Sequence, residues 1–347
     1  MAAAFHASPQ GFQVRRTAVP ELASRDVLVR VRFCGICGSD LHIYTGNRPV
    51  PPDICPGHEM SGEVVAVSED VREVALGDGV CIDTLVTCRT CRYCLSGQHW
   101  LCSQLRVVGM HMLGGMAEYV RVPAYSVVRL PDGLAYDVAA LAQPLSLSVH
   151  GLHIAGLTAG ERVLILGSGG IGLLAAFAAR ALGAGEVLAT YRYPHQGEAM
   201  RRIGAQRIWS ADSEGMAALA EACRHEPVDI VVETVGGRAD TFDRAVELVR
   251  PGGRVLVIGS FTEKLVLDPA ALLFKGLHVI GTRGRCRPGL RSDLELSAHM
   301  LATHQQDVSH IITHRVPLAA VNEAFAIAAN KSTGSLKVLV QPWPDQS

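Results

Sequence analysis

Alternation of apolar and polar residues, interrupted by Gly, Pro and Asp, dominates the chain up to about residue 150. Short runs of this kind, rich in Val, Ile, Phe and Tyr, are typical of antiparallel strands joined by turns. The expected strands cover residues 26–33, 61–67, 79–82 and 118–122. This pattern predicts a β-rich, barrel-like unit at the start of the chain.

The pattern changes near Thr158, where short uninterrupted apolar runs begin to alternate with Ala-rich helical stretches. Such runs indicate strands buried on both faces, and their alternation with helices indicates a doubly wound parallel sheet in an α/β fold. The expected strands cover residues 162–166, 186–189, 229–232, 254–258 and 278–280, and the expected helices 171–182 and 239–249. After about residue 285 the pattern is mixed, with a helix expected over 321–329 and a strand over 336–340.

Composition narrows the class of protein. Of the 347 residues, 48% are hydrophobic and 19% are charged, which argues against disorder. Lys and Arg total 32 and Asp and Glu total 33, so the nearly neutral chain has no general attraction for nucleic acid or an anionic membrane. The uncharged stretch 163–179 is short for a membrane span and is interrupted by glycines. No secretory signal is visible, so we expect a cytoplasmic protein without a membrane or nucleic-acid partner.

One turn matches a nucleotide-binding pattern. Gly167, Gly169 and Gly172 have the spacing G-x-G-x-x-G, directly after an apolar strand and at the start of a helix. The first glycine permits a tight turn, the second lets a pyrophosphate approach the backbone, and the third lets helix and strand pack closely. Gly170 and Ile171 open the helix, whose free N–H groups attract phosphates. We predict a dinucleotide site here, and a plain strand–turn–helix is the alternative.

The residues after the next strand favour NADP(H) over NAD(H). An NAD site normally carries Asp or Glu at the end of this strand to bind the ribose hydroxyls. Here the residues are Tyr191, Arg192 and Tyr193, and the first carboxylate is Glu198. Because Arg binds phosphate well, we predict that Arg192 contacts the 2′-phosphate and that a Tyr191 or Tyr193 ring lies beside the adenine. The alternative is a solvated Arg192 and the use of NAD without an acidic partner.

Four of the ten cysteines lie close together in the sequence. Cys88, Cys91, Cys94 and Cys102 follow the spacing C-x2-C-x2-C-x7-C. Four thiolates on a compact loop suit tetrahedral zinc, and a closed set of four sulfurs leaves no position for substrate. We predict a structural zinc ion that holds this loop in place, and four unrelated reduced cysteines are the alternative.

A second metal site is expected from residues earlier in the chain. Cys37, His58 and Glu59 are able to supply three ligands, which leaves the open position that a catalytic zinc needs. A thiolate and a carboxylate would neutralise the charge of the ion. Zinc in such a site lowers the pKa of a bound oxygen and polarises it. We therefore expect two zinc ions per chain, one catalytic and one structural.

Taken in order, these motifs resemble those of a known family. Residues 35–42, the Gly-His-Glu triplet at 57–59, the four-cysteine loop and the glycine turn resemble the zinc-containing medium-chain dehydrogenase/reductase superfamily, which includes the alcohol dehydrogenases. The most similar branch is that of the sorbitol and threonine dehydrogenases. Residues 114–120, 311–318 and 322–325 also resemble family segments, so the resemblance covers essentially the whole chain.

The resemblance implies a split architecture. Residues 1–150 would form a β-rich, GroES-like catalytic domain, to which residues 286–347 return. A Rossmann dinucleotide-binding domain, residues 151–285, would be inserted between these parts. Members of the family are commonly dimers or tetramers, so we expect a homodimer or homotetramer. The apolar residues 265–267 with 271–274 are a candidate interface, and an internal packing edge is an equally good explanation.

The resemblance also implies roles for single residues. Cys37 and His58 match zinc ligands of the family, and Glu59 matches a residue that binds zinc in some members and lies behind the ligands in others. Ser39 matches the hydroxyl that bonds the substrate oxygen. His42 matches a residue that passes the proton to solvent in some members.

Two further positions concern the same site. Asp40 matches the carboxylate that orients the zinc-bound imidazole and so fixes its tautomer. Gln143 stands where the family usually carries Glu, and an amide is a poorer zinc ligand than a carboxylate. Glu59 would then bind zinc while Gln143 holds the zinc-bound water or a substrate hydroxyl. The alternative is a weakened zinc site.

These motifs predict a zinc-dependent oxidoreductase that transfers hydride between NADP(H) and a small secondary alcohol or polyol, or the matching ketone. Ser39 and His42 would relay the proton. Three alternatives stay open: an NAD-linked polyol or amino-alcohol dehydrogenase, a reductase for a ketone or aminocyclitol of one pathway, and a relic of the fold without catalytic zinc. Two zinc ions per chain would support the enzyme, and one would support the relic.

Overall fold

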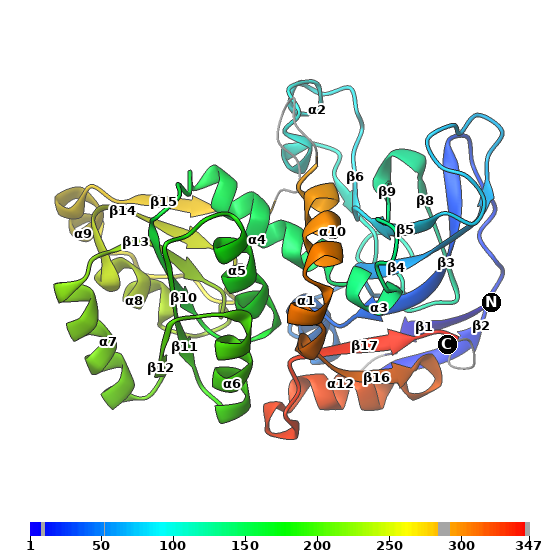
Figure 1. Ribbon diagram of the computed structural model, residues 1–347. Helices are drawn as coiled ribbons and strands as arrows, with labels where there is room; N and C mark the ends of the chain where they lie inside the picture. The colour runs from blue at the N-terminus through cyan, green and yellow to red at the C-terminus, as the bar shows by residue number, and fades with distance from the viewer. Residues whose placement is uncertain (8–10, 52, 284–291, 344–347) are drawn as a thin grey trace. The chain divides into compact units, whose positions relative to one another are not determined.

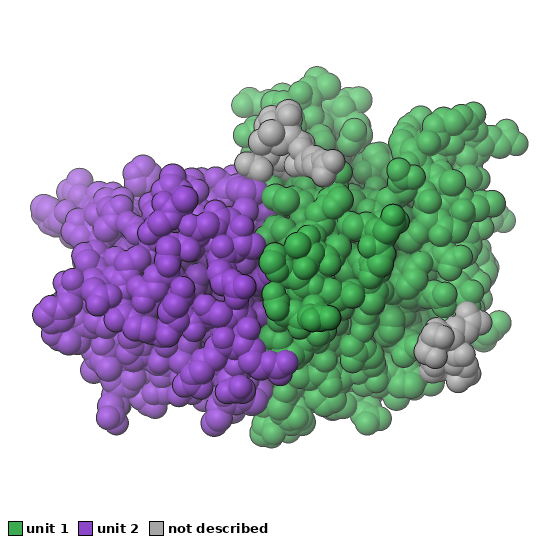
Figure 2. Space-filling model, viewed as in Figure 1, with its two compact units in different colours: residues 1–143, 285–347 green, residues 144–284 purple. Residues whose placement is uncertain are grey.

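The β-rich and the alternating α/β parts of the sequence fold into separate units in the computed structural model (Figure 1). The structure describes residues 1–7, 11–51, 53–283 and 292–343. One compact unit, called unit 1 here, consists of residues 1–143 and 285–347 (Figure 2). The other, unit 2, consists of residues 144–284.

Unit 1 is built on a mostly antiparallel sheet to which early and late parts of the chain contribute. The strand order is β16-β17-β3-β4-β5-β9, and β8 also pairs with β3. β17 runs antiparallel to β3 with Val340 opposite Cys34, so the late strands complete the early sheet. The strands are β3 (Asp26–Gly35), β4 (Glu59–Val67), β5 (Gly79–Ile82), β8 (Tyr119–Pro123), β9 (Val127–Arg129), β16 (Ile312–Pro317) and β17 (Lys337–Gln341).

Unit 1 also contains short helices and two small sheets, β1 with β2 and β6 with β7. Part of its core is an aromatic cluster, in which the Tyr44 ring stacks on the rings of Phe325 and Phe12 at centroid distances of 5.1 and 6.0 Å. The strands are β1 (Ala2–His6), β2 (Phe12–Arg16), β6 (Leu85–Val86) and β7 (Arg106–Val107). The helices are α1 (Gly38–Tyr44), α2 (Arg92–Leu95), α3 (Tyr136–Ala139), α10 (Asp293–Thr303), α11 (Gln305–Val308) and α12 (Val321–Ala329).

Unit 2 contains a parallel sheet with the strand order β12-β11-β10-β13-β14-β15. The chain leaves the central strand β10 first in one direction and then in the other, which is the doubly wound topology expected from the apolar runs. The strands are β10 (Arg162–Leu166), β11 (Glu186–Tyr191), β12 (Arg207–Ser210), β13 (Val228–Glu233), β14 (Val249–Val257) and β15 (His278–Gly281). The helices are α4 (Ala142–Ile154), which links the two units in sequence, α5 (Gly170–Ala181), α6 (Pro194–Ile203), α7 (Ser213–His225), α8 (Thr241–Leu248) and α9 (Pro269–Lys275).

The start of β14 differs from the sequence-based expectation. The apolar run predicted a strand from residue 254, whereas β14 begins at Val249, which pairs with Val228 before a register shift. Pro251 and two glycines interrupt the apolar pattern at this point and therefore conceal the first part of the strand.

The uncharged stretch 163–179 folds as expected, into most of β10, the glycine turn and most of α5. Its strand residues and most of its helix residues are buried within unit 2. Among the residues that the structure describes, no helix is long and apolar enough to cross a membrane.

Candidate functional site

Cys37, His58 and Glu59 come together in unit 1. One potential ligand atom of each residue lies within 4.8 Å of the others. Cys37 is the residue before helix α1, His58 is the last residue before β4, and Glu59 is the first residue of β4. Because β3 and β4 pair with Gly35 opposite Glu59, the strand register brings the Cys37 turn next to the His58–Glu59 pair.

Asp40 connects two members of this cluster. Its side chain is fully buried, its Oδ2 accepts a hydrogen bond of 3.0 Å from the Cys37 backbone N–H, and its Oδ1 lies 3.4 Å from His58 Nδ1. Burial lowers the pKa of His58, but the charges of Asp40 and Cys37 outweigh burial and raise this pKa well above its usual value. Asp40 therefore holds His58 with its Nε2 directed away from the carboxylate, which suits a metal ligand.

Helix α1 carries the two residues expected to relay the proton, Ser39 and His42. Ser39 Oγ is 3.3 Å from His58 Nε2, so the hydroxyl lies beside the imidazole edge that faces the ligand cluster. His42 is three residues further along α1 and therefore on the same helix face, and it is half-buried. Ser39 and His42 are both half-buried, so each side chain is partly accessible to solvent.

A buried lysine completes the surroundings of Glu59. Lys337 Nζ donates to Glu59 Oε2 at 2.6 Å and to the Ile36 carbonyl at 3.2 Å. Burial lowers the pKa of Lys337, but the carboxylate of Glu59 raises it more, so the ammonium stays charged. Lys337 was not predicted from the sequence, although a Lys within the apolar run Leu-Lys-Val-Leu-Val was a signal.

The residues of this cluster fit a zinc ion. They offer one sulfur, one imidazole nitrogen and one carboxylate, a donor set typical of catalytic zinc. The second oxygen of Glu59, Oε1, is buried and has no hydrogen-bond partner among the described residues, which is costly unless a cation lies nearby. The three ligands leave a fourth position open, as a catalytic site requires.

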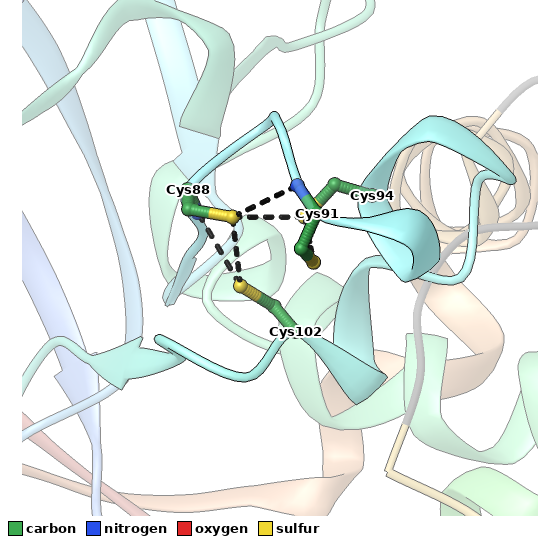
Figure 3. Close-up of side chains that lie close together, drawn as sticks. All are labelled: Cys88, Cys91, Cys94 and Cys102. Atoms are coloured by element: carbon green, nitrogen blue, oxygen red, sulfur yellow. Dashed lines mark hydrogen bonds between the residues drawn. The ribbon is translucent and has the colours of Figure 1, made fainter.

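The four cysteines of the predicted loop also converge, and Figure 3 shows their sulfurs facing one another. The Sγ–Sγ distances are 3.5 Å for Cys88–Cys102, 3.6 Å for Cys91–Cys94 and 3.9 Å for Cys88–Cys94. Zinc–sulfur bonds of about 2.3 Å in a tetrahedron require sulfurs about 3.8 Å apart, so the cage has the size of a zinc site.

Backbone N–H groups support the sulfurs of this cage. The N–H of Cys91 donates to Cys88 Sγ at 3.3 Å, and the N–H of Cys88 donates to Cys102 Sγ at 3.4 Å. Hydrogen bonds from Thr90 and Cys91 lower the pKa of Cys88 to about 6, so this sulfur is a thiolate near neutral pH. Burial and the neighbouring sulfurs raise the pKa of Cys94 to about 11. A bound cation is therefore needed for all four to ionise together.

The glycine turn of unit 2 has the geometry of a phosphate-binding turn. Gly167 has φ +99°, and a Cβ on Gly172 would lie 1.9 Å from the Gly167 carbonyl oxygen, so both positions require glycine. Two threonines fix the turn from the neighbouring strands. Gly167 N–H donates to Thr190 Oγ1 at 3.0 Å, and Thr234 Oγ1 donates to the Leu166 carbonyl at 2.8 Å. Gly169 precedes α5, and the space around it is open.

The end of β11 carries no carboxylate. Tyr191 packs its ring on Gly197 of α6, where a Cβ would lie 3.1 Å from the ring. Arg192 is exposed, and its guanidinium lies 5.7 Å from the centre of the Tyr193 ring. Nearby, a cleft of about 460 Å³ is lined by residues of unit 2 alone, among them Thr190 and Asp212. The Asp212 carboxylate accepts from the N–H of Gly215 and so caps α7.

Gln143, Tyr44 and His111 are placed as follows. Gln143 lies in the first turn of α4 and is 2% exposed. Tyr44 belongs to the aromatic cluster of unit 1, which is a packing role. His111 Nδ1 accepts from the Val107 backbone N–H at 3.1 Å and is exposed.

Two family models match the chain. The model described as the alcohol dehydrogenase GroES-like domain matches residues 23–132, and the one described as zinc-binding dehydrogenase matches residues 170–302. Among curated relatives, an L-threonine 3-dehydrogenase of Chelativorans sp. (strain BNC1) is 31% identical over 351 residues, which is 99% of both proteins.

Solved structures show the same relationship. A putative zinc-binding dehydrogenase from Sinorhizobium meliloti 1021 bound to NADP has a TM-score of 0.88 and 33% identity, with 98% of this chain and 99% of that chain covered. Galactitol-1-phosphate dehydrogenase from Escherichia coli has a TM-score of 0.90 and 28% identity, with 99% and 100% covered.

Proposed function

We propose a reaction for this chain, which belongs to the zinc-containing medium-chain dehydrogenases of the alcohol dehydrogenase superfamily. The proposed reaction is the transfer of hydride between NADP(H) and a secondary alcohol or polyol, or the matching ketone. It is a zinc- and nicotinamide-dependent dehydrogenase by membership of this family. The observation that carries the proposal is the convergence of Cys37, His58 and Glu59 beside Ser39, with Lys337 behind Glu59.

In this proposal Cys37, His58 and Glu59 hold a catalytic zinc ion, and the four cysteines hold a second, structural one. When bound, zinc supplies a Lewis acid for the substrate oxygen and the nicotinamide supplies the hydride carrier. Ser39 Oγ would accept the hydroxyl proton of the alcohol while it gives its own proton to His42, and His42, on the same face of α1, would release a proton to solvent.

Glu59 and Lys337 set the charge of the centre. Lys337 occupies one oxygen of Glu59 and leaves Oε1 as the atom available to the metal. Lys337 thereby fixes the orientation of the carboxylate and determines which oxygen faces the metal. Gln143 would then hydrogen-bond a water or a substrate hydroxyl through its amide.

The cofactor site is proposed to extend from the glycine turn to the end of β11. Gly167, Gly169, Gly170, Ile171 and Gly172 would bind the pyrophosphate, as the open space at Gly169 permits. Arg192 is exposed and forms no salt bridge with a carboxylate of the described residues, so its guanidinium is available for a 2′-phosphate.

A second candidate function is the NAD-linked oxidation of an amino alcohol. The observation that favours it is the set of relatives named L-threonine 3-dehydrogenase, which match along nearly the whole chain. L-threonine carries a secondary alcohol, so the same zinc chemistry would serve.

A turnover assay that follows nicotinamide absorbance tests the proposal. Secondary alcohols, polyols and L-threonine are each offered with NADP and with NAD, and ketones with the reduced cofactors. We expect turnover of a secondary alcohol, polyol or ketone with NADP(H), and Ser39→Ala should lower kcat roughly 10²- to 10⁴-fold. Turnover of L-threonine with NAD alone would favour the second candidate, and no turnover by zinc-loaded protein would contradict both.

We further propose that the protein is a homodimer formed through unit 2. β15 is an edge strand of the sheet, and most of its residues are exposed, although parallel sheets are normally covered on both faces. The preceding segment, including α9, contains no buried residue. Val266, Leu273 and Phe274 are 89%, 75% and 85% exposed.

A second copy of the chain fits this surface better than another occupant. Two edge strands related by a twofold axis pair antiparallel and extend one sheet across both copies, which makes the surface complementary to itself. Monomers rarely expose apolar patches above a few hundred Å², and a stable interface needs about 800 Å² per partner. Six apolar side chains between Leu265 and Val279 are exposed by 37–89%, and such a run of exposed apolar residues is typical of a surface that a partner covers.

A further inference from the structure

Unit 2 contains a fully buried carboxylate that the proposed mechanism does not use. Glu233 is the last residue of β13 and is 0% exposed. It forms no ion pair with an Arg, Lys or His of the described residues. Its Oε2 is buried without a hydrogen-bond partner there, and a Cβ on Gly259 would lie 2.2 Å from that atom. A buried charge of this kind needs compensation from hydrogen bonds.

The compensation comes from the loop that follows β13. Glu233 Oε1 accepts from the Val235 N–H at 2.8 Å, the Gly236 N–H at 2.9 Å and Thr241 Oγ1 at 2.7 Å. Thr241 is the first residue of α8, whose N-cap residue Asp240 makes no side-chain capping bond. The carboxylate of Glu233 therefore fixes both ends of residues 234–240 and benefits from the positive end of the α8 dipole.

The same loop is packed on the glycine turn. Thr234 Oγ1 donates to the carbonyls of Leu166 and Gly167 at 2.8 and 3.2 Å. A Cβ on Gly167 would lie only 2.6 Å from Val235 Cγ2, so Val235 packs directly against the turn. Val235 is 49% exposed. The turn that would receive the pyrophosphate thus has Thr234 and Val235 as its neighbours, and their backbone is held by Glu233.

We propose that Glu233 is a positioning residue of the nicotinamide cofactor site. It touches neither cofactor nor substrate. Its carboxylate collects the N–H groups of Val235 and Gly236, and this places the exposed Val235 side chain and the Thr234 hydroxyl against the glycine turn. The proposal rests on the proposed function, because it assumes that the turn binds NADP(H) or NAD(H).

Two substitutions separate positioning from charge. In Glu233→Gln the side-chain oxygen still accepts from the three donors, so the Kd for NADPH should stay within about threefold of the native value. In Glu233→Ala the donors lose their shared acceptor and the loop moves, so the Kd should rise about tenfold or more. The Kd is measured by fluorescence titration on protein whose zinc content has been checked.

A second measurement reports the loop without cofactor. Hydrogen exchange of peptides covering residues 234–241 should be faster in Glu233→Ala than in the native protein and should return to the native rate in Glu233→Gln. Asp229→Asn is the matched control, because Asp229 lies in the same strand but bonds Arg162 and Arg250 instead of the loop. This control should lower the melting temperature and leave the Kd for NADPH unchanged.

The outcomes are distinguishable. An unchanged Kd and unchanged exchange in Glu233→Ala would overturn the positioning role while the native protein still binds NADPH. Native protein that binds neither NADPH nor NADH would overturn the proposed function itself. If Glu233→Ala does not fold, Glu233→Asp replaces it: the shorter side chain withdraws the carboxylate, so weaker NADPH binding with faster loop exchange supports the proposal, and native values of both overturn it.

Discussion

Lys337 and Glu59 share one buried ion pair at the edge of the proposed zinc centre, with side-chain exposures of 5% and 1%. Lys337→Met leaves the carboxylate buried without its partner, so we expect the unfolding free energy of the zinc-stripped protein to fall by roughly 3–5 kcal/mol. Zinc should restore part of this loss, because the ion takes over the charge of Glu59. Urea unfolding with a chelator and with added zinc measures both effects.

Lys331→Met is the control for this prediction. Lys331 is half-buried near Lys337, and burial together with the charge of Lys337 lowers the pKa of Lys331 to about 8. It makes no bond to Glu59, so its removal should cost little and should not respond to zinc. Equal losses of stability in both variants would contradict the role given to Lys337.

Arg192 decides the cofactor preference if it contacts the 2′-phosphate. Hydrogen bonds to charged groups contribute about 1.5–3 kcal/mol, so Arg192→Ala should raise the Kd for NADPH roughly tenfold or more and leave the Kd for NADH unchanged. Arg201→Ala, which removes an exposed Arg of α6, is the control. Fluorescence titration measures both constants, and tighter native binding of NADH than of NADPH would refute the NADP assignment.

Residues whose partners are near in sequence were the easiest to predict. Cys88, Cys91, Cys94 and Cys102 were recognisable because their spacing alone suits one metal ion. Lys337 was not, because it reaches Glu59 across 278 positions of the sequence, and only the pairing of β17 with β3 brings it there. The roles proposed for Ser39, His42 and Gln143 stay predictions.

Among the elements, the four-cysteine loop leaves Leu95 and Leu101 76% and 45% exposed, so we expect it to depend on its metal for stability. We expect Cys91→Ser to remove one zinc ion per chain and to make the loop around α2 sensitive to protease, while unit 2 stays resistant. Cys223→Ser, which changes a half-buried thiol in α7, should keep the native zinc content. Limited proteolysis with zinc analysis provides the readout, and an unchanged zinc content in Cys91→Ser would contradict the structural site.

Elements whose periodic pattern is not broken by Gly or Pro were predicted to within a few residues of their bounds. β10 and α12 have the expected bounds because nothing interrupts their patterns. β14 was located too late because Pro251 follows its first two residues and breaks the apolar run. Loop–strand connections such as that of Glu233 with Val235 and Gly236 were not visible, because hydrogen bonds of a side chain to loop amides leave no periodic pattern.

At the scale of the whole molecule, the exposed surface around β15 predicts self-association. Phe274→Asp places a charge in the proposed interface, so we expect a dimer in the native protein and a monomer in the variant. Leu76→Asp is the control, because Leu76 is 65% exposed and belongs to unit 1, outside the proposed interface. Light scattering after size exclusion gives the masses, and a native monomer would exclude the interface.

The doubly wound sheet and the β-rich unit were both predictable from periodicity, and the family from four motifs. The residue limits 1–150, 151–285 and 286–347 stay predictions for the domains. The return of the C-terminal segment to the first sheet followed only from the resemblance, because no local pattern of residues 336–340 specifies β3 as the partner of β17.

The number of zinc ions per chain distinguishes a zinc-dependent enzyme from a relic of the fold. Elemental analysis of the native protein and of Cys37→Ser gives the number of zinc ions per chain. The proposed enzyme requires two in the native protein and one in Cys37→Ser, because only the site of Cys37, His58 and Glu59 loses a ligand. One zinc ion in the native protein, unchanged in Cys37→Ser, would mean that the catalytic centre holds no metal and would contradict the proposed chemistry.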